Sequence, residues 1–248
     1  GRADAGTLIR LDTMTAIRPP EFFPSLPVAA LLLTAERFVV ADTFAYSRQS
    51  YQNRTRIRTS AGTGRDAMWL TVPVRKGQPG RPIRSVPLAD PTGAWRRAHL
   101  RTLAACYNNA PYFAHYAPQL EHLFDAVFAD NEVPPTLGTL TVAAMRWAHR
   151  VLASDAELVV ASEQPRKPAT LAEVWRDAGV EPLLTLPDAA AVEQAQLPDV
   201  AQTVATFEEA ARRQVFEGFV PGCGLLDLVF NYGPAARLVV REGMRFAA

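Results

Sequence analysis

An arginine-rich stretch carries the clearest chemical signal in this sequence. Residues Tyr46 to Arg58 read YSRQSYQNRTRIR and hold four arginines and no acid. The second half alternates as a β-strand does, so Arg54, Arg56 and Arg58 are expected to share one face. Guanidinium groups bind phosphate and carboxylate bidentately, which predicts an anion-binding strand. The alternative is a solvated strand face whose arginines discourage edge-to-edge pairing.

A histidine on a predicted helix is the best acid–base candidate. His99 shares a helical face with Trp95 and Cys106, which would enclose and tune the imidazole. The alternative is a core or boundary histidine that is hydrogen-bonded to the backbone. Cys106 has no visible activating base, so it is more typical of a small core residue than of a nucleophile.

The third candidate group lies near the C-terminus, in the segment GFVPGCGLLDLVFNYGP. A helix over 224–231 places Asp227 and Asn231 at positions i and i+4 of one face, and Gly233 and Pro234 are typical of its end. The pair would orient a substrate or the arginines. The alternative is a buried carboxylate that pairs with an arginine of the basic segment.

Composition predicts a globular protein. The chain has 248 residues, of which 48% are hydrophobic, enough for the core of one or two domains. No apolar run approaches the ~20 residues of a membrane span. The two cysteines suggest no disulfide framework, so we expect a reduced, cytoplasmic protein. No glycine-rich phosphate motif, P-loop lysine or Cys/His zinc spacing is present, and the cofactor stays unknown.

Charge is unevenly distributed although the net charge is only +1. The segment 43–120 holds twelve basic and two acidic residues, and the rest holds fourteen and twenty-three. This asymmetry predicts an anionic ligand on the basic part, or docking of the two parts on each other. Nucleic acid is disfavoured, because no reader motif is present. A nucleotide- or RNA-associated protein is the weakest hypothesis, and steep salt dependence would be its sign.

Hydrophobic periodicity and the positions of glycine and proline predict alternating strands and helices. In chain order they are a strand at 7–11, a proline-rich loop at 18–27, a helix at 28–36, a strand at 37–41, a hairpin of 54–59 with 67–74, a short strand at 83–88, helices at 92–107, from Pro118 and at 136–152, a βαβ-like passage of 157–161, 170–178 and 182–186, an irregular stretch at 188–200, and a helix at 224–231. Asp42 would lie at the carboxyl end of a strand, where open α/β sheets bind ligands.

These elements predict an α/β fold, a Rossmann-like mixed sheet with an antiparallel hairpin addition and a helical middle section. A domain division falls near residue 155. Residues 1–155 would form a basic α/β and helical part, and residues 156–248 a smaller βαβ-like part. A single composite domain is the alternative.

Four blocks in this order resemble the WbqC-like family. They read FVVADTFAYSRQSYQNRTRIRT, LTVPV, WRRAHLRTLAACYNNAPYF and FVPGCGLLDLVFNYGP. The family pattern has a Tyr-x-x-x-x-Tyr-x-Asn-Arg-x-x-Ile block, a Leu-Thr-Val-Pro-Val strand, a Trp-x-x-x-His helix and a Leu-Asp-Leu-x-Phe-Asn-x-Gly ending. Many members carry a His-Gln-Pro-x-Tyr signature in the first loop. Here that loop reads Arg18-Pro19-Pro20-Glu21-Phe22, so the resemblance is closer to the branch without this motif.

The resemblance implies a role in bacterial cell-surface polysaccharide (O-antigen) biosynthesis, in which glycine or another aminoacyl or acyl group passes from an anionic activated donor to a sugar acceptor. His99 would be the general base, and Asp227 would orient the reactants. The expected substrate- and anion-binding residues are Tyr51, Asn53, Arg54, Arg56, Trp95, Tyr107 and Asn231. The alternative is a non-catalytic binding protein that recognises a polysaccharide precursor or a partner enzyme. The oligomeric state is not predicted.

Overall fold

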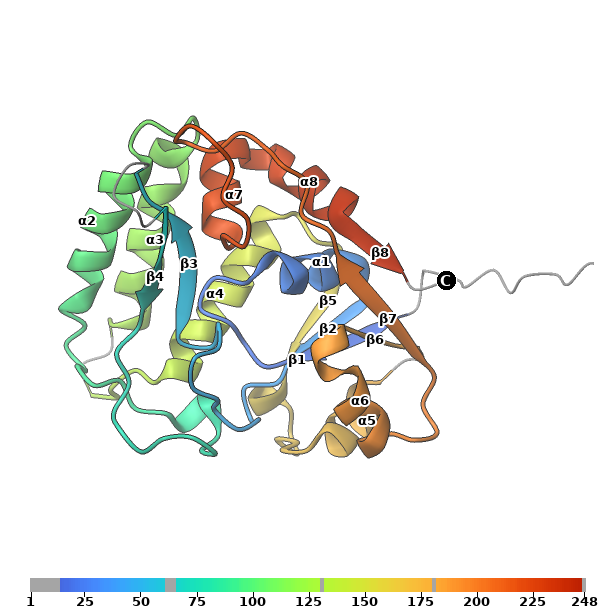
Figure 1. Ribbon diagram of the computed structural model, residues 1–248. Helices are drawn as coiled ribbons and strands as arrows, with labels where there is room; N and C mark the ends of the chain where they lie inside the picture. Colours follow the sequence, from blue (N-terminus) through green and yellow to red (C-terminus); the bar gives the residue numbers. More distant parts are fainter. Residues whose placement is uncertain (1–13, 61–65, 130–131, 180–181, 247–248) are drawn as a thin grey trace, which may run out of the picture.

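The protein is a layered α/β structure built on one six-stranded sheet. The computed structural model describes residues 14–60, 66–129, 132–179 and 182–246 (Figure 1). The sheet strands are β1 (Thr15–Arg18), β2 (Arg37–Val40), β5 (Glu157–Val160), β6 (Leu183–Thr185), β7 (Gln202–Phe207) and β8 (Met244–Phe246). Their spatial order is β5-β2-β1-β6-β7-β8, with all pairs parallel except the antiparallel β7 and β8. This is the strand order of a doubly wound Rossmann fold, and it confirms the predicted fold class.

Helices cover both faces of the sheet, as alternation along the strands requires. In β2, Phe38 and Val40 belong to the larger core, whereas Val39 belongs to a second, smaller core on the other face. Helices α1 (Leu26–Thr34), α4 (Leu137–Val151) and α8 (Ala236–Gly243) lie on the first side, and α5 (Leu171–Ala178) and α6 (Pro187–Gln196) on the second (Figure 1). Because α1 is apolar on all sides, it is suited to burial beneath other helices.

A separate two-stranded hairpin and a helical section lie beside this sheet. Strands β3 (Arg54–Arg58) and β4 (Ala67–Thr71) pair antiparallel, as the sequence predicts. They lie near α2 (Trp95–Tyr107), α3 (Phe113–Val127) and α7 (Leu225–Tyr232) (Figure 1). The sheet itself contains strands from both sides of residue 155.

Several predicted elements differ from the structure. The segment 83–88 is a short 3-10 turn (Ile83–Ser85) followed by isolated bridges, not a strand. Helix α3 begins at Phe113 and contains Pro118, because burial of Phe113 and Tyr116 extends it toward the N-terminus. The stretch 188–200 contains α6, which Pro187 and Asp188 begin favourably. Strands β5 and β6 are separated by β2 and β1.

The first strand of the described residues was not predicted. The first described strand is β1, within a stretch that the sequence did not predict as a strand, and residues 7–11 lie outside the described part of the chain. Strand β1 pairs with β2 in full register, from Thr15 opposite Arg37 to Arg18 opposite Val40. The predicted order of strand, loop, helix and strand is therefore present, with its first strand at Thr15–Arg18.

Gly138 on α4 allows an unusually close approach of the 3-10 turn. A Cβ at this position would lie 2.3 Å from Arg84 Cα and 2.9 Å from its backbone nitrogen, so the backbone of the turn would have to move. Helix propensity alone predicts that Gly138→Ala stabilises the protein by about 1 kcal/mol. We expect instead a loss of about 1–3 kcal/mol, as for overpacking in a core. Urea unfolding measures it, and a gain in stability would contradict the contact.

Candidate functional site

The sheet has a switch point between β1 and β6. From β1 the chain builds outward through β2 and β5, and on the other side it builds outward through β6, β7 and β8. The connection that follows β1 and the connection that follows its neighbour β6 therefore run on opposite faces of the sheet. In open α/β sheets, ligands bind in the crevice outside the carboxyl ends of such strands.

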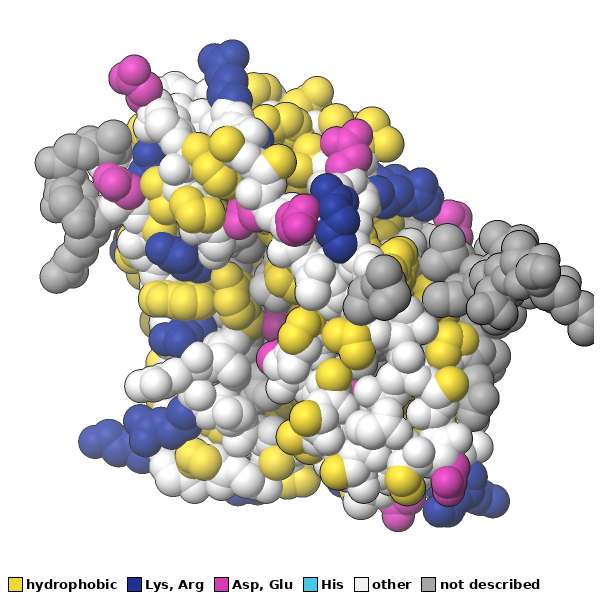
Figure 2. Space-filling view, turned by 45° about the vertical axis from the view of Figure 1, so that its right-hand side comes forward, with side chains coloured by type: hydrophobic (Ala, Val, Ile, Leu, Met, Phe, Trp, Pro, Cys, Tyr) yellow, Lys and Arg dark blue, Asp and Glu magenta, His cyan; other side chains and the backbone are white. Residues whose placement is uncertain are grey.

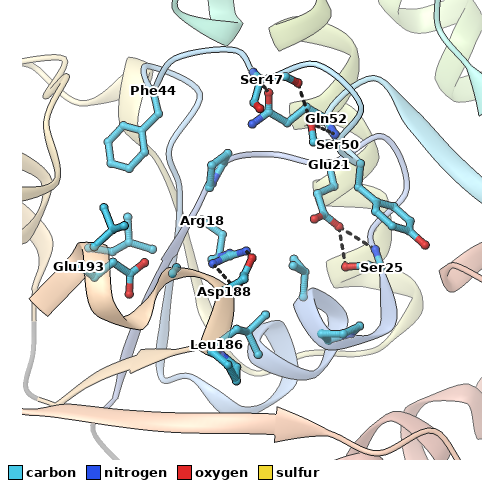
Figure 3. A pocket seen from close by; sticks show the side chains of 18 of the residues that line it. Arg18, Glu21, Ser25, Phe44, Ser47, Ser50, Gln52, Leu186, Asp188 and Glu193 are labelled. Atoms are coloured by element: carbon cyan, nitrogen blue, oxygen red, sulfur yellow. Dashed lines mark hydrogen bonds and ion pairs between the residues drawn. The ribbon is translucent and has the colours of Figure 1, made fainter. Parts of the chain in front are cut away.

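A cavity of about 1380 Å³ lies at this crevice (Figure 3). Its walls come from the β1–α1 loop, the start of α6, the loop over 44–52 and residues of the C-terminal segment. The residues labelled in the close-up are Arg18, Glu21, Ser25, Phe44, Ser47, Ser50, Gln52, Leu186, Asp188 and Glu193 (Figure 3). Acidic side chains are also visible inside a hollow on one face of the molecule (Figure 2). The cavity is large enough for a small-molecule ligand.

Glu21 lies in the β1–α1 loop, and its carboxyl contacts the N-cap residue of α1, Ser25. One oxygen of its carboxyl, Oε2, accepts hydrogen bonds from the backbone nitrogen of Ser25 at 2.7 Å and from the Ser25 hydroxyl at 2.9 Å. Burial raises the pKa of Glu21, and the two Ser25 hydrogen bonds oppose that rise. A helix N-terminus is where a phosphate would bind in this fold. Here the carboxyl of Glu21 already accepts the hydrogen bond of the Ser25 backbone N–H group, which a phosphate would otherwise accept.

The loop that presents Glu21 is strained. Phe23 has a φ of +56°, which is rare for a bulky residue. Its ring is buried and packs edge-on against Trp147 at 5.4 Å between centroids, so tertiary packing holds the conformation. Strain of this kind gathers at functional sites.

A salt bridge crosses the cavity beside Glu21. Arg18, at the end of β1, donates to both carboxylate oxygens of Asp188, at 2.9 and 3.3 Å. Asp188 belongs to the first turn of α6, where the helix dipole favours a negative charge. The pair therefore connects the ends of the two strands at the switch point.

Glu193 is a second buried carboxyl in the same cavity. Its side chain lies on α6 and burial raises its pKa, while Thr185 and Arg18 lower it. Within the described residues, Glu193 Oε2 is buried and has no hydrogen-bond partner. Figure 3 shows Glu193 and Glu21 on opposite sides of the Arg18–Asp188 pair. A ligand that donates a hydrogen bond would satisfy the free oxygen.

The cavity disfavours anions. Four carboxyl side chains line it (Glu21, Asp188, Glu193 and Glu209), and Arg18 is the one cationic side chain among the described lining residues. Cys223 also lines it, but burial raises the pKa of its thiol to about 12, so the thiol is not an activated nucleophile. The site suits a ligand rich in hydroxyl or amino groups.

The three arginines of β3 bind backbone carbonyls. Arg54 stacks on Trp69 at 4.1 Å and donates to the Gln49 carbonyl. Arg56 donates to the Pro221 carbonyl at 3.3 Å. Arg58 is 1% exposed and donates to the carbonyls of 59, 66 and 217 at 2.7–2.9 Å. These guanidinium groups donate hydrogen bonds to backbone carbonyls of neighbouring loops. An anion site on β3, as predicted, would require the same groups to face a ligand.

The predicted pair on α7 is part of a buried polar network. Asp227 accepts hydrogen bonds from the Tyr107 hydroxyl at 3.0 Å and from Gln214 at 2.9 Å, and Arg212 lies 3.6 Å away. Asn231 donates to the Asp227 backbone carbonyl at 2.7 Å and approaches its carboxyl at 3.4 Å, as the i, i+4 spacing predicts. Burial raises the pKa of Asp227. Asp227 is thus a partnered, buried carboxyl, and its neighbouring arginine is Arg212, which lies outside the basic segment 43–120.

His99 packs among aromatic rings on α2. Its ring lies 4.8 Å from Trp95 and 6.1 Å from Phe22, measured between centroids. Burial lowers the pKa of His99 to about 4, against an opposing interaction with the Thr71 backbone. Such an imidazole is neutral at pH 7 and is a weak base. The general-base role of His99 stays a prediction, and its surroundings do not favour it.

One of the nine sequence-predicted site residues lines the cavity. Tyr51 does so, and its hydroxyl donates to the Gly222 carbonyl at 3.1 Å. Asn53 instead donates its side chain to the Val72 carbonyl at 3.1 Å. Glu193 and Asp188 were not predicted as site residues, because they fall in a stretch predicted to be irregular. A signal for Glu21 was available, because it lies where other chains carry the His-Gln-Pro signature.

The described residues show neither a metal cluster nor a membrane-spanning helix. No cluster of three or more His, Cys, Asp or Glu side chains is arranged to hold a metal ion within the described ranges. Among the described helices, none has both the length and the apolar character that a membrane span requires. Both cysteines are free thiols.

The strand order and the cavity define a Rossmann-type α/β protein with a cavity at the switch point of its sheet. The chain belongs to the WbqC-like protein family, which matches residues 19–238. It is 27% identical over 236 residues to the uncharacterized protein Rv1507c of Mycobacterium tuberculosis, covering 89% of this chain and 94% of that protein. No solved structure matches the chain.

Proposed function

We propose that this protein is a transferase of bacterial cell-surface polysaccharide biosynthesis, and that the switch-point cavity binds its sugar acceptor. The carboxyl of Glu21, partly buried in the β1–α1 loop and lining the cavity, is the observation that supports this proposal most directly. Carboxyl, amide and hydroxyl side chains around it would bind sugar hydroxyls. The acidic lining disfavours an anionic donor at the same place, so the acceptor is the better occupant.

In this proposal Glu21 is the general base for acyl or aminoacyl transfer. An acceptor oxygen or nitrogen attacks the acyl carbon of an activated donor, and Glu21 takes the proton as the new bond forms. The donor's leaving group departs with the electron pair of the broken bond. A raised pKa brings a carboxyl nearer to the operating pH, which favours proton transfer. Glu193 would accept a hydrogen bond from the acceptor through its unpaired oxygen.

The test is a transfer assay with mass-spectrometric detection. Aminoacyl and acyl donors are combined with neutral and amino sugars, and the wild type is compared with Glu21→Gln. Glutamine keeps an oxygen that accepts the Ser25 hydrogen bonds but cannot take the proton. Loss of a general base lowers turnover by about 100-fold or more. Glu36→Gln, an exposed glutamate outside the cavity, is the matched control.

Two outcomes would contradict the proposal. If Glu21→Gln folds and turns over as the wild type does, another group is the base. If a sugar binds saturably to the cavity and no donor gives product, the protein is a non-catalytic binding protein for a polysaccharide precursor. His99→Gln in the same assay shows whether the histidine has the catalytic role that the sequence predicts.

A further inference from the structure

A second cavity opens at the same edge of the sheet, at the carboxyl ends of β2 and β5. It has a volume of about 930 Å³ and lies among the ends of these strands, α3 and α4. Asp42 follows β2 and Ser162 follows β5, and both line it. The carboxyl ends of parallel strands are the edge at which α/β sheets bind ligands. This cavity and the one at the switch point have no lining residue in common.

Its charge is opposite to that of the first cavity. Four cationic side chains line it (Arg84, Arg146, Arg150 and Lys167), against the carboxylates of Asp42 and Glu163. Both carboxylates already have partners. Glu163 accepts from Arg146 at 2.7 Å through each oxygen, and Asp42 accepts from the Ser162 backbone at 2.9 Å.

Three of the cations remain without a partner. Within the described residues, the side chains of Arg84, Arg150 and Lys167 make no hydrogen bond or ion pair. Lys167 has a φ of +47°, a conformation that is uncommon outside glycine. Helix α4 begins at the cavity and carries no acid in its first turn, so the positive end of its dipole is not offset by a carboxylate there.

Apolar side chains also line the cavity. They are Leu123 and Val127 of α3 and Val142 and Trp147 of α4. A cavity lined by both cations and apolar side chains suits a ligand that carries an anionic group and an apolar part. Inorganic anions alone would leave the apolar side chains without a partner.

We propose that this second cavity binds an organic phosphate. Its phosphate group would bind Arg84, Arg150 and Lys167, and its organic part would pack against the apolar side chains that α3 and α4 contribute. Guanidinium groups pair bidentately with phosphate oxygens, and lysine adds a point charge. This site is independent of the Glu21 proposal, because its residues are different and its test measures binding, not turnover.

The test is isothermal titration of the full chain with ADP, 1-naphthyl phosphate, inorganic pyrophosphate and adenosine. We expect at least one of the two organic phosphates to bind with a dissociation constant below about 1 mM, and more tightly than pyrophosphate and adenosine. Arg150→Gln and Lys167→Gln should each weaken that binding by about tenfold or more, the loss of one charge-assisted contact. Thermal unfolding of the free variants shows that they remain folded.

The matched control is Arg101→Gln, which removes an exposed arginine of α2 outside both cavities. It should bind as the wild type does. The proposal is overturned if neither organic phosphate binds, if pyrophosphate binds as tightly as both, or if all three variants weaken binding equally.

Discussion

Replacing Asp227 with alanine is expected to lower the free energy of unfolding by about 3–5 kcal/mol, because two buried donors lose their acceptor and a buried arginine loses one of its two carboxylates. The Asp227 side chain is 0% exposed, and that of Arg212 is 6% exposed. The substitution would leave Gln214 and the Tyr107 hydroxyl without their shared acceptor, whereas Arg212 would keep its ion pair with Glu209 at 2.6 Å. Urea unfolding at pH 7 measures the loss.

Two variants separate the charge from the hydrogen bonds. Asp227→Asn keeps one acceptor oxygen but removes the charge, so its loss should be smaller than that of alanine. Asp125→Ala removes the exposed partner of Arg96 and should cost no more than about 1 kcal/mol. A loss for Asp227→Ala as small as that of Asp125→Ala would show that the network does not stabilise the fold.

The strongly patterned elements were predictable from the sequence. Alternating residues and a glycine-containing connector indicated the hairpin of β3 and β4, and the apolar stripes of α2 and α4 indicated those helices. The i, i+4 spacing of Asp227 and Asn231 gave their contact as well. These features depend on local periodicity, which one sequence displays.

Short or weakly patterned elements were not predictable in the same way. Strand β1 has four residues, and parallel partners on both sides stabilise it. Helix α6 contains three consecutive alanines and exposed polar residues, with little amphipathic pattern. Their places depend on tertiary pairing, which overrides local propensity. The switch-point cavity lies between these two elements. Its residues were therefore not predictable either, because tertiary pairing decides where both elements lie.

The three arginines of β3 show what residue spacing leaves open. Alternation predicts that they share one face, but it carries no information about what covers that face. In the fold, backbone carbonyls accept from these guanidinium groups, including those of Pro221 and Glu217 from a distant part of the chain. Arginine offers five N–H donors, so it can bind several carbonyls at once. The same spacing therefore fits either an anion site or side chains that hold loops in place, and the anion site stays a prediction.

The two cavities at the carboxyl edge of the sheet differ in the charge of their lining residues. The one at β1 and β6 is acidic and contains the strained loop with Glu21, whereas the one at β2 and β5 is basic. An acceptor rich in hydroxyl or amino groups suits the first, and a phosphate suits the second. The uneven charge of the sequence predicts an anionic ligand on the basic segment 43–120, but of the four cations that line the second cavity only Arg84 belongs to that segment.

Acid should destabilise the protein through His99. The pKa of the folded-state imidazole is about 4, against 6.5 when it is solvated, because burial penalises its charged form. Below pH 6.5 the unfolded chain binds a proton that the folded protein binds only near pH 4. Stability is therefore lost as the pH falls through this window, and the contribution reaches about 3 kcal/mol at pH 4.

Comparison of three proteins isolates this contribution. In urea unfolding at pH 7 and pH 4, the wild type and the exposed-histidine variant His122→Gln should lose stability alike. His99→Gln should lose about 3 kcal/mol less than either. An equal loss in all three would place the His99 pKa near its ordinary value, and the imidazole would then be a competent base at pH 7. The same measurement thus decides between a desolvated structural histidine and the general base that the sequence suggested.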